Sequence, residues 1–328
     1  MSLAPFFGER LVRYAELQPC TNAFIDARSP GSDKKENFTI IGPGVAENPH
    51  QHVHIREPHG FNIGGARQPP KCTNSLHSHL TAEVFIIHQG TWRFVWGEHG
   101  DAGAVVLTPG DTISIPVNIF RGFENIGEDT GFMFSVLGGD DPGRVHWAPQ
   151  VIEKARGYGL VLLDNGSLVD TTLGETVPPG QLPVQPSSRA DIAYIRTPDA
   201  IEMTGCVVKH NTLALEENAD DNVSRKSRRA IIGQPDAPIA TPHGFSVQYL
   251  LLKNGAVESL QNSGHATVLL IHRGSVLWCS DSGASAIFYA GDTFSIPAHT
   301  PSTLDASVSA EIFIVRHGDQ LPEKNVDV

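Results

Sequence analysis

The sequence predicts an all-β protein built from two copies of one domain, and three observations carry this prediction. Glycine (32 residues) and proline (23 residues) make up about a sixth of the 328 residues, which favours short strands and tight turns over a helical bundle. Runs rich in β-branched and aromatic residues recur every eight to twelve residues, as in sandwiches and barrels. The third observation is an internal repeat, and the chain length suits two domains of roughly 150 residues each.

The repeat consists of three matched segments in the same order. The first two pairs lie 184 residues apart and the third 181 residues apart, so a short deletion separates them. The pairs are 58–61 with 242–245 (PHGF in both), 87–90 with 271–274, and 110–116 with 291–297. We therefore expect two copies of the domain, near 40–147 and 225–318. The predicted division is an N-terminal arm (1–39), a first barrel (40–147), a connector (148–190) and a second barrel (191–328).

Each copy reads as a series of strands. In the first copy, residues 83–88 and 91–96 are rich in β-branched and aromatic residues and are flanked by glycines. Residues 111–115 alternate polar and apolar, as a half-buried strand does. Residues 132–137 form another apolar strand, which 311–315 matches in the second copy.

The connector has a different pattern. Residues 148–156 predict a short helix ending at Gly157, and Asp164–Gly166 is a hairpin turn between two apolar runs. The proline-rich stretch 178–186 predicts an extended linker. The acidic and basic residues of 216–229 predict a solvated loop; a nucleic-acid patch is the weaker alternative in an acidic protein.

Composition excludes several classes of protein. A net charge of −12 and a pI near 5.6 argue against nucleic-acid partners and an anionic membrane surface. No run of 18 apolar residues is present, and the first residues do not resemble a secretory signal. The scattered cysteines predict free thiols in a reducing compartment, so we expect a cytoplasmic protein; they are Cys20, Cys72, Cys206 and Cys279.

One short motif carries metal-binding chemistry. His77 and His79 are separated by one residue, so on a strand their side chains share a face. Glu83 follows closely and could join them around one ion. Two histidines and a carboxylate with open positions suit Fe(II) or Mn(II).

The spacing around this motif resembles the two signature motifs of the cupin superfamily. The first is HxH-x3-E-x6-G over 77–90, and the second is G-x5-P-x-N-x6-N, with Gly110, Pro116, Asn118 and Asn125. Two such copies resemble the bicupins, which include oxalate decarboxylases, quercetin and gentisate dioxygenases and metal-free storage globulins. The resemblance implies two jelly-roll β-barrels, a divalent metal inside a barrel (Fe(II) first, with Mn, Ni or Zn as alternatives), a small-molecule substrate and a homo-oligomer.

Arg121 departs from the cupin pattern, because the second motif normally supplies a third histidine at this position. An arginine cannot ligate a metal, and about 4 Å from an ion each unit-charge pair would cost about 4 kcal/mol at an effective dielectric of 20. Three arrangements are open. Arg121 could anchor a substrate carboxylate, pair with Glu83, or turn out to solvent.

The second copy acts as an internal control. All four ligand positions are lost there, where the residues are Gln261, Ser263, Thr267 and Ser302. Histidines present in both copies are therefore expected to be structural; they are His59, His243, His88 and His272. His265 is predicted to be a surface residue, and His52 and His54 to lie on a polar strand or loop, with a second metal site as the lesser alternative.

Strand parity predicts the walls of the cavity. Phe85 and Ile87 share the face of Glu83, and Phe123 and Asn125 share the face of Arg121. Around an arginine, these residues would suit a small aromatic or apolar carboxylate. The leading hypothesis is a metal-dependent dioxygenase with one site, His77, His79 and Glu83, and with Arg121 as substrate anchor. The alternatives are a metal-dependent isomerase, decarboxylase or lyase, and a metal-free ligand-binding or sensing module.

Overall fold

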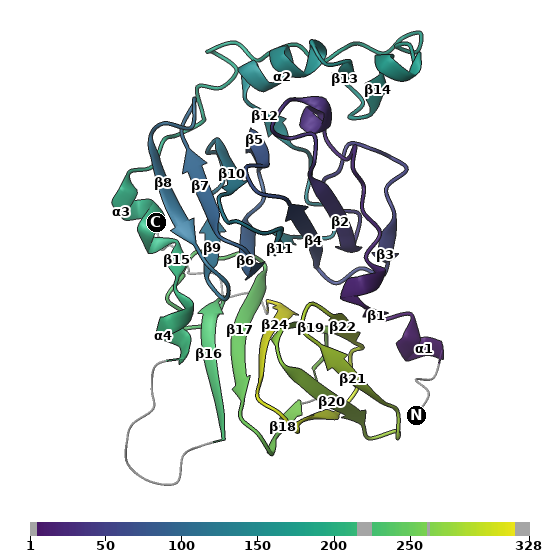
Figure 1. Ribbon diagram of the computed structural model, residues 1–328, viewed down its shortest axis with the longest axis vertical. Helices are drawn as coiled ribbons and strands as arrows, with labels where there is room; N and C mark the ends of the chain where they lie inside the picture. The colour runs from purple at the N-terminus through teal and green to yellow at the C-terminus, as the bar shows by residue number, and fades with distance from the viewer. Residues whose placement is uncertain (1–4, 215–224, 261–262, 319–328) are drawn as a thin grey trace, which may run out of the picture.

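The computed structural model describes residues 5–214, 225–260 and 263–318, and these form two jelly-roll barrels, as the sequence predicts. The barrels stack along the long axis of the molecule, and the connector lies at the far end of the first barrel (Figure 1). Within the described ranges, no helix has the length and apolar character needed to cross a membrane.

Two facing sheets make up the first barrel. The seven-stranded sheet consists of β15 (Val207–Val208), β9 (Thr112–Ile115), β6 (Glu83–Gln89), β11 (Gly131–Gly138), β4 (Phe61–Gln68), β2 (Glu36–Ile41) and β3 (Val53–Ile55). The five-stranded sheet consists of β12 (His146–Trp147), β5 (Thr73–Ser78), β10 (Arg121–Asn125), β7 (Trp92–Trp96) and β8 (Gly103–Leu107). The strands predicted from the alternating and apolar runs are all present, within two residues of the expected bounds.

The second barrel repeats this plan with fewer strands. Its six-stranded sheet consists of β1 (Leu11–Val12), β22 (Thr293–Ile296), β19 (Thr267–Arg273), β24 (Ala310–His317), β17 (Phe245–Leu252) and β16 (Lys226–Ile232). Its four-stranded sheet consists of β18 (Ala256–Leu260), β23 (Ser302–Ala306), β20 (Ser275–Ser280) and β21 (Ser285–Tyr289).

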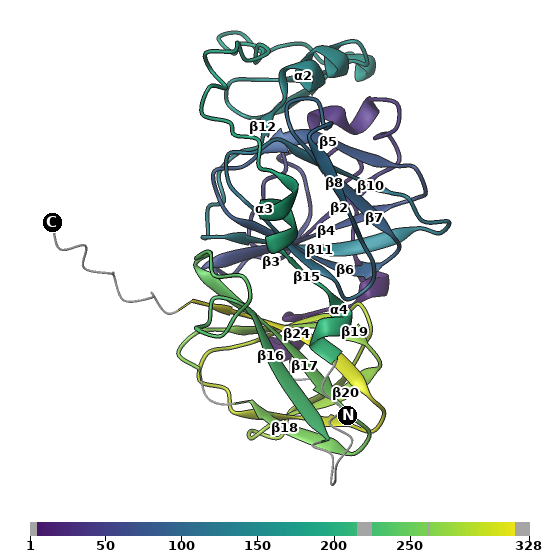
Figure 2. The same ribbon diagram turned by 90° about the vertical axis from the view of Figure 1, so that its left-hand side faces the viewer.

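Two segments cross from one barrel to the other, which the predicted boundaries after residues 39 and 190 do not capture. Strand β1 of the N-terminal arm pairs with β22 of the second barrel. Strand β15, which lies after the connector, pairs with β9 of the first barrel. The helices α3 (Ala200–Gly205) and α4 (His210–Ala214) flank β15 along one side of the molecule (Figure 2). Sequence periodicity did not find these exchanges because each strand has only two residues.

The shared histidines meet the opposite barrel in a reciprocal way. His59 Nε2 lies 2.7 Å from Ser295 Oγ, and His243 Nε2 lies 2.6 Å from Ser114 Oγ. Since each pair joins matched residues of the repeat, the barrels pack about a pseudo-two-fold relation. The prediction that these two histidines are structural agrees with these contacts.

The connector has the predicted helix and hairpin. Helix α2 spans Pro149–Arg156, and β13 (Leu160–Leu162) pairs with β14 (Leu168–Asp170).

The remaining short helices lie mostly in the N-terminal arm. Helix α1 spans Pro5–Gly8, and the 3₁₀ helices are η1 (Tyr14–Glu16), η2 (Ile25–Arg28) and, after β14, η3 (Thr171–Leu173).

The charged stretch differs from its prediction as a solvated loop. Residues 215–224 lie outside the described residues, but Lys226–Ile232 forms strand β16. On this edge strand, Lys226 and Arg228 pair with Glu258. The residues KSRRAII partly alternate between more exposed and less exposed positions, as a strand does. The cluster of basic residues in this segment had favoured the interpretation as a loop.

Candidate metal centre

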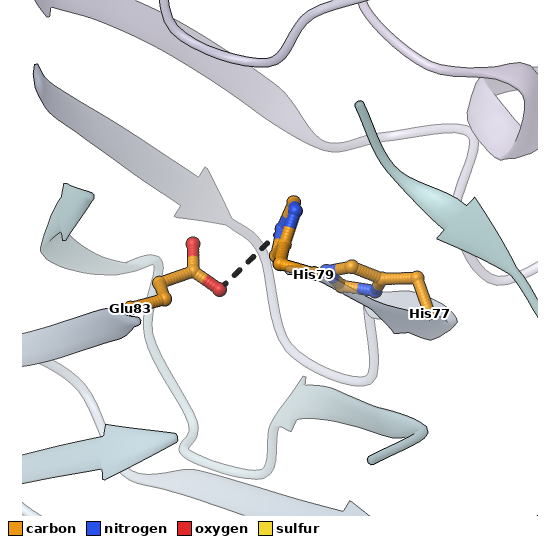
Figure 3. A group of neighbouring side chains, drawn as sticks. All are labelled: His77, His79 and Glu83. Atoms are coloured by element: carbon orange, nitrogen blue, oxygen red, sulfur yellow. Dashed lines mark ion pairs between the residues drawn. The ribbon is translucent and has the colours of Figure 1, made fainter. Parts of the chain in front are cut away.

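The predicted ligands meet where the two sheets of the first barrel face each other. His77 lies near the end of β5, His79 follows this strand, and Glu83 begins β6 in the opposite sheet. Figure 3 shows the Glu83 carboxylate directed toward the imidazole of His79, with His77 beside it. Their ligand atoms all lie within 4.8 Å of one another. The HxH-x3-E spacing spans a tight turn, and this turn brings strands from opposite sheets to one point.

Each of these side chains is buried, with residue exposures of 4% for His77, 4% for His79 and 5% for Glu83. His79 Nε2 lies 3.6 Å from Glu83 Oε2, while His79 Nδ1 is buried without a hydrogen-bond partner. His79 therefore directs its Nε2 at the carboxylate, and this nitrogen is the one placed to share a ligand with Glu83.

Arg121 adopts the second of the three arrangements left open by the sequence, pairing with Glu83. It begins β10, opposite His77 in the β5–β10 register, and it is 1% exposed. Its Nη2 donates to Glu83 Oε2, and its Nη1 donates to the backbone oxygen of His77 at 2.8 Å. Arg121 does not line the cavity, so the structure does not give it the predicted role of substrate anchor.

Burial and the arginine charge set the protonation of the cluster. Burial, and next the charge of Arg121, lower the pKa of both His77 and His79 well below the ordinary range. Both imidazoles are therefore neutral at pH 7, the form that binds metals. Burial raises the pKa of Glu83, and Arg121 opposes this shift. Burial also lowers the pKa of Arg121, while Glu83 opposes that change.

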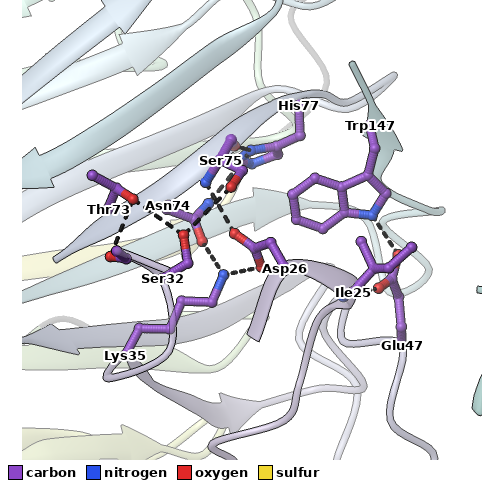
Figure 4. Close-up of polar contacts among 11 residues, drawn as sticks. Ile25, Asp26, Ser32, Lys35, Glu47, Thr73, Asn74, Ser75, His77 and Trp147 are labelled. Atoms are coloured by element: carbon purple, nitrogen blue, oxygen red, sulfur yellow. Dashed lines mark hydrogen bonds and ion pairs between the residues drawn. The ribbon is translucent and has the colours of Figure 1, made fainter. Parts of the chain in front are cut away.

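A polar network behind the site orients His77 (Figure 4). Its Nδ1 lies 2.7 Å from the backbone oxygen of Ser75 and 3.4 Å from the side-chain nitrogen of Asn74. Donation from Nδ1–H to Ser75 fixes the tautomer that leaves Nε2 free as a ligand. Asn74 accepts a 2.8 Å hydrogen bond from Lys35, which also pairs with Asp26. The N-terminal arm therefore takes part in the site, which no sequence pattern indicated.

A second buried carboxylate, Glu47, borders the same region. Its Oε1 accepts a 2.6 Å bond from Trp147 Nε1, and its Oε2 accepts a 2.8 Å bond from the backbone N–H of Ile25. Burial raises the pKa of Glu47 to about 8, although these donors favour the charged form. Glu47 holds Trp147 and the 3₁₀ helix η2 in place beside the site.

A small cavity of about 70 Å³ opens onto His77, His79 and Glu83. Its walls are mostly apolar and aromatic, and they include Phe24, Phe38, Phe85, Phe123, Leu137 and Trp147. Two of the predicted pocket residues, Phe85 and Phe123, line it as expected. A neighbouring cavity shares part of this wall, namely Gly44, Val45, Ala46, Val145 and Trp147, and gives a route toward the connector.

The other two predicted pocket residues do not line the cavity, so that part of the prediction was wrong. Ile87 is fully buried in a cluster with residues such as Trp92 and Phe94. Asn125 donates to the backbone oxygens of Gln68 and Asp129, so it stabilises a turn. Strand parity places both on the expected face, but they lie too far along their strands to reach the site.

The donor set fits a divalent ion. Two neutral imidazoles and one carboxylate are typical ligands for Fe(II), Mn(II), Ni(II) or Zn(II); His77 Nε2 is free, and His79 Nε2 faces the Glu83 carboxylate at 3.6 Å. The formal charge of Arg121 is offset by its direct pairing with Glu83. The metal hypothesis therefore agrees with the geometry of the donor set.

The second barrel lacks this chemistry at matching places. Thr267 begins β19 and Ser302 begins β23, where Glu83 and Arg121 begin β6 and β10; Gln261 lies outside the described residues. Ser263 precedes β19 in an irregular segment. His265 is exposed, as predicted for a surface residue. His52 and His54 flank Val53 on β3, with ring centroids 4.5 Å apart.

Comparison with solved structures places this architecture among known proteins. An oxalate decarboxylase from Lactobacillus farciminis aligns with 97% of this chain and 86% of its own, at 11% identity and a TM-score of 0.56. A Bacillus subtilis oxalate decarboxylase mutant aligns over 94% and 77%, at 11% identity and a TM-score of 0.55. Hazelnut vicilin aligns over 94% and 84%, at 13% identity and a TM-score of 0.51. No protein-family model and no curated protein matches the sequence.

Proposed function

This chain has the bicupin fold, and on that premise we propose that its first barrel is a metal-dependent enzyme site. His77, His79 and Glu83 would hold one divalent ion, with Fe(II) as the first choice. The observation that carries the proposal is the convergence of these ligand atoms within 4.8 Å at the wall of an apolar cavity.

The proposed substrate is a small aromatic or apolar carboxylate. The aromatic walls suit an apolar body, and the lining residues include no lysine or arginine to bind an anion. The charge that binds a substrate carboxylate would therefore come from the ion. A bound Fe(II) would supply dioxygen chemistry, since three protein ligands leave positions open. An isomerase, decarboxylase or lyase reaction would use the same ligands.

Arg121 has the role of a positioning residue in this proposal. By pairing with Glu83 and with the backbone oxygen of His77, it fixes two of the three ligands. It also favours the ionised form of Glu83, which is the form that ligates.

A metal-free ligand-binding module is the second candidate, and the Glu83–Arg121 pair favours it. This pair already neutralises the carboxylate without an ion. The discriminating quantity is therefore the metal content of the protein.

Metal content tests the proposal directly. We expect wild type, purified without chelator and reconstituted with Fe(II), to hold one more ion per chain than His77→Ala. Ser263→Ala is the matched control, since Ser263 occupies the position of His79 in the second barrel. Equal metal content in wild type and His77→Ala would overturn the metal site and leave the binding module. Oxygen consumption with a panel of small aromatic carboxylates then tests the reaction class.

A further inference from the structure

A second group of metal-ligating side chains lies outside the first-barrel cavity. His210, His272 and Glu311 each offer a ligand atom, and these atoms lie within 4.8 Å of one another. His210 begins α4, just after the crossing strand β15, while His272 and Glu311 come from the neighbouring strands β19 and β24. This inter-barrel cluster therefore joins a segment that crosses to the first barrel with the sheet of the second barrel.

His272 is the member of this cluster whose hydrogen-bonding groups lack partners. It is 3% exposed, and neither of its ring nitrogens has a hydrogen-bond partner. Burial lowers the pKa of His272 to about 3, so its imidazole is neutral. A buried neutral imidazole with two unused nitrogens is costly unless a ligand occupies the space between it and its neighbours.

The other two members of the cluster, His210 and Glu311, are in direct contact. His210 Nε2 lies 2.6 Å from Glu311 Oε2, and the ring centroids of His210 and His272 are 5.8 Å apart. Among the described residues, Arg273 pairs with Glu311 at 3.4 Å from Oε1, and the Arg273 side chain is half-exposed. A cavity lined by His272 and Arg273 reaches this region from outside.

The pseudo-symmetric position in the first barrel serves as an internal control. There His88 replaces His272, Tyr14 replaces His210, and Phe132 replaces Glu311, as the matching strand registers show. His88 contacts the rings of Tyr14 and Phe132, with no carboxylate in the set. The same place in the fold is thus an aromatic cluster in one barrel and a histidine–carboxylate cluster in the other.

The geometry points to a second divalent-cation site at His210, His272 and Glu311, and Zn²⁺ is the ion that suits these ligands best. Two imidazoles and one carboxylate form a common zinc set, with water as the fourth ligand. In a tetrahedral site the ligand atoms lie about 3.3 Å apart, so small side-chain rotations would complete it. The ion would cross-link the crossing segment to the second barrel and stabilise the assembly of both barrels. This inference does not depend on the proposed enzyme site.

Titration with Co²⁺ as the probe tests the site on the full chain. We expect His272→Phe, which keeps the ring contact with Phe313, to bind one Co²⁺ per chain fewer than wild type. Glu311→Gln, which changes one oxygen to nitrogen, is expected to weaken that binding at least tenfold. His77→Ala should retain this ion, which separates the two sites.

Thermal unfolding provides a second readout. Zn²⁺ should raise the melting temperature of wild type and of His77→Ala by several degrees, and chelator should reverse this rise, because an ion bound only to the folded state stabilises it. The rise should be absent when His272→Phe is combined with His77→Ala, because the first-barrel ligands could also bind Zn²⁺. If His272→Phe does not fold, Glu311→Gln decides. Co²⁺ stoichiometry and affinity in Glu311→Gln and His272→Phe equal to those of wild type would overturn the proposal.

Discussion

The two barrels share one architecture, yet the first is hollow beside its candidate metal centre, while large apolar side chains fill the interior of the second over its described residues. In the first barrel, strand β4 presents Gly64, Gly65 and Ala66 to the cavity. The matching residues of β17 are Gln248, Tyr249 and Leu250, and Leu250 belongs to an apolar core with Trp278 and other large side chains. A few changes in side-chain volume therefore decide whether this fold contains a cavity.

The comparison also separates what the fold needs from what the sites need. The reciprocal contacts of His59 with Ser295 and of His243 with Ser114 occur in both halves, and they hold the barrels together. The buried cluster of His77, His79, Glu83 and Arg121 occurs in one half only. Because buried polar groups are costly, a barrel without such a cluster can fill its centre with apolar side chains instead.

The largest difference between the barrels should follow from breaking the buried ion pair. Arg121→Leu leaves Glu83 buried without its partner, and we expect a loss of about 3–5 kcal/mol in the free energy of unfolding. The matching change, Ser302→Ala, should cost less than about 1 kcal/mol, because Ser302 Oγ has no hydrogen-bond partner. Urea unfolding of both variants measures this contrast. Similar losses in both would show that the ion pair contributes little.

A reciprocal exchange of side-chain volume tests why one barrel is hollow. Leu250→Ala should destabilise the protein by about 2–5 kcal/mol, because it opens a cavity in the filled barrel. Ala66→Leu should change the stability by less than about 1.5 kcal/mol, since existing space in the hollow barrel accepts the added atoms. Thermal and urea unfolding compare the two variants.

Ligand binding by the same two variants tests whether the cavity of the first barrel is the binding site. Ala66→Leu should weaken binding of benzoate, a probe for small aromatic carboxylates, at least tenfold in calorimetry, while Leu250→Ala should leave it unchanged. Unaltered benzoate binding in Ala66→Leu would show that the cavity is not the binding site.

Much of the fold could be predicted from the sequence because the repeat and the strand patterns are local signals. The matched segments PHGF and GDTxSIP gave the two barrels, and the alternating and apolar runs gave strands such as β6 and β11. Crossing strands β1 and β15 could not be predicted, because two-residue pairings depend on tertiary contacts that leave no periodicity.

The candidate site was predictable only where its residues belong to one motif. His77, His79 and Glu83 follow from spacing, and Phe85 and Phe123 follow from strand parity. The supporting residues come from separate parts of the chain: Asn74 from β5, Lys35 from the N-terminal arm and Trp147 from β12. No short sequence pattern therefore joins them. The sequence left the orientation of Arg121 open because this depends on the register of β10 against β5.

The contacts shared by both halves predict a common response to acid. Burial, and next the charge of Arg10, lower the pKa of His59 to about 4, and burial lowers the pKa of His243. Below about pH 6.5 the unfolded chain therefore binds more protons than the folded chain, so stability falls as the pH decreases from 6.5 toward 4.

His59 should contribute about 2–3 kcal/mol to this acid loss, and His243 should contribute in the same direction. In urea unfolding at pH 7 and pH 4.5, His59→Gln and His243→Gln should each reduce the difference in the free energy of unfolding between the two pH values. A reduction in one variant alone would show that the two halves of the interface are not equivalent.

The smallest expected effect concerns Asn74, which packs beside His77 in the first barrel. The second barrel lacks the metal ligands that such a residue would orient. Asn74→Ala removes the side chain that packs 3.4 Å from His77 Nδ1 and that holds Lys35 through its oxygen, so the imidazole should be less well packed and oriented. Loss of such a supporting contact weakens metal binding by about tenfold, or about 1.4 kcal/mol. Asn37→Ala is the control, because Asn37 lines the same cavity while its side-chain nitrogen is buried without a partner. Competition with a metal indicator measures both affinities. If Asn37→Ala weakens metal binding as much as Asn74→Ala does, the loss reflects the cavity wall in general and not the orientation of His77.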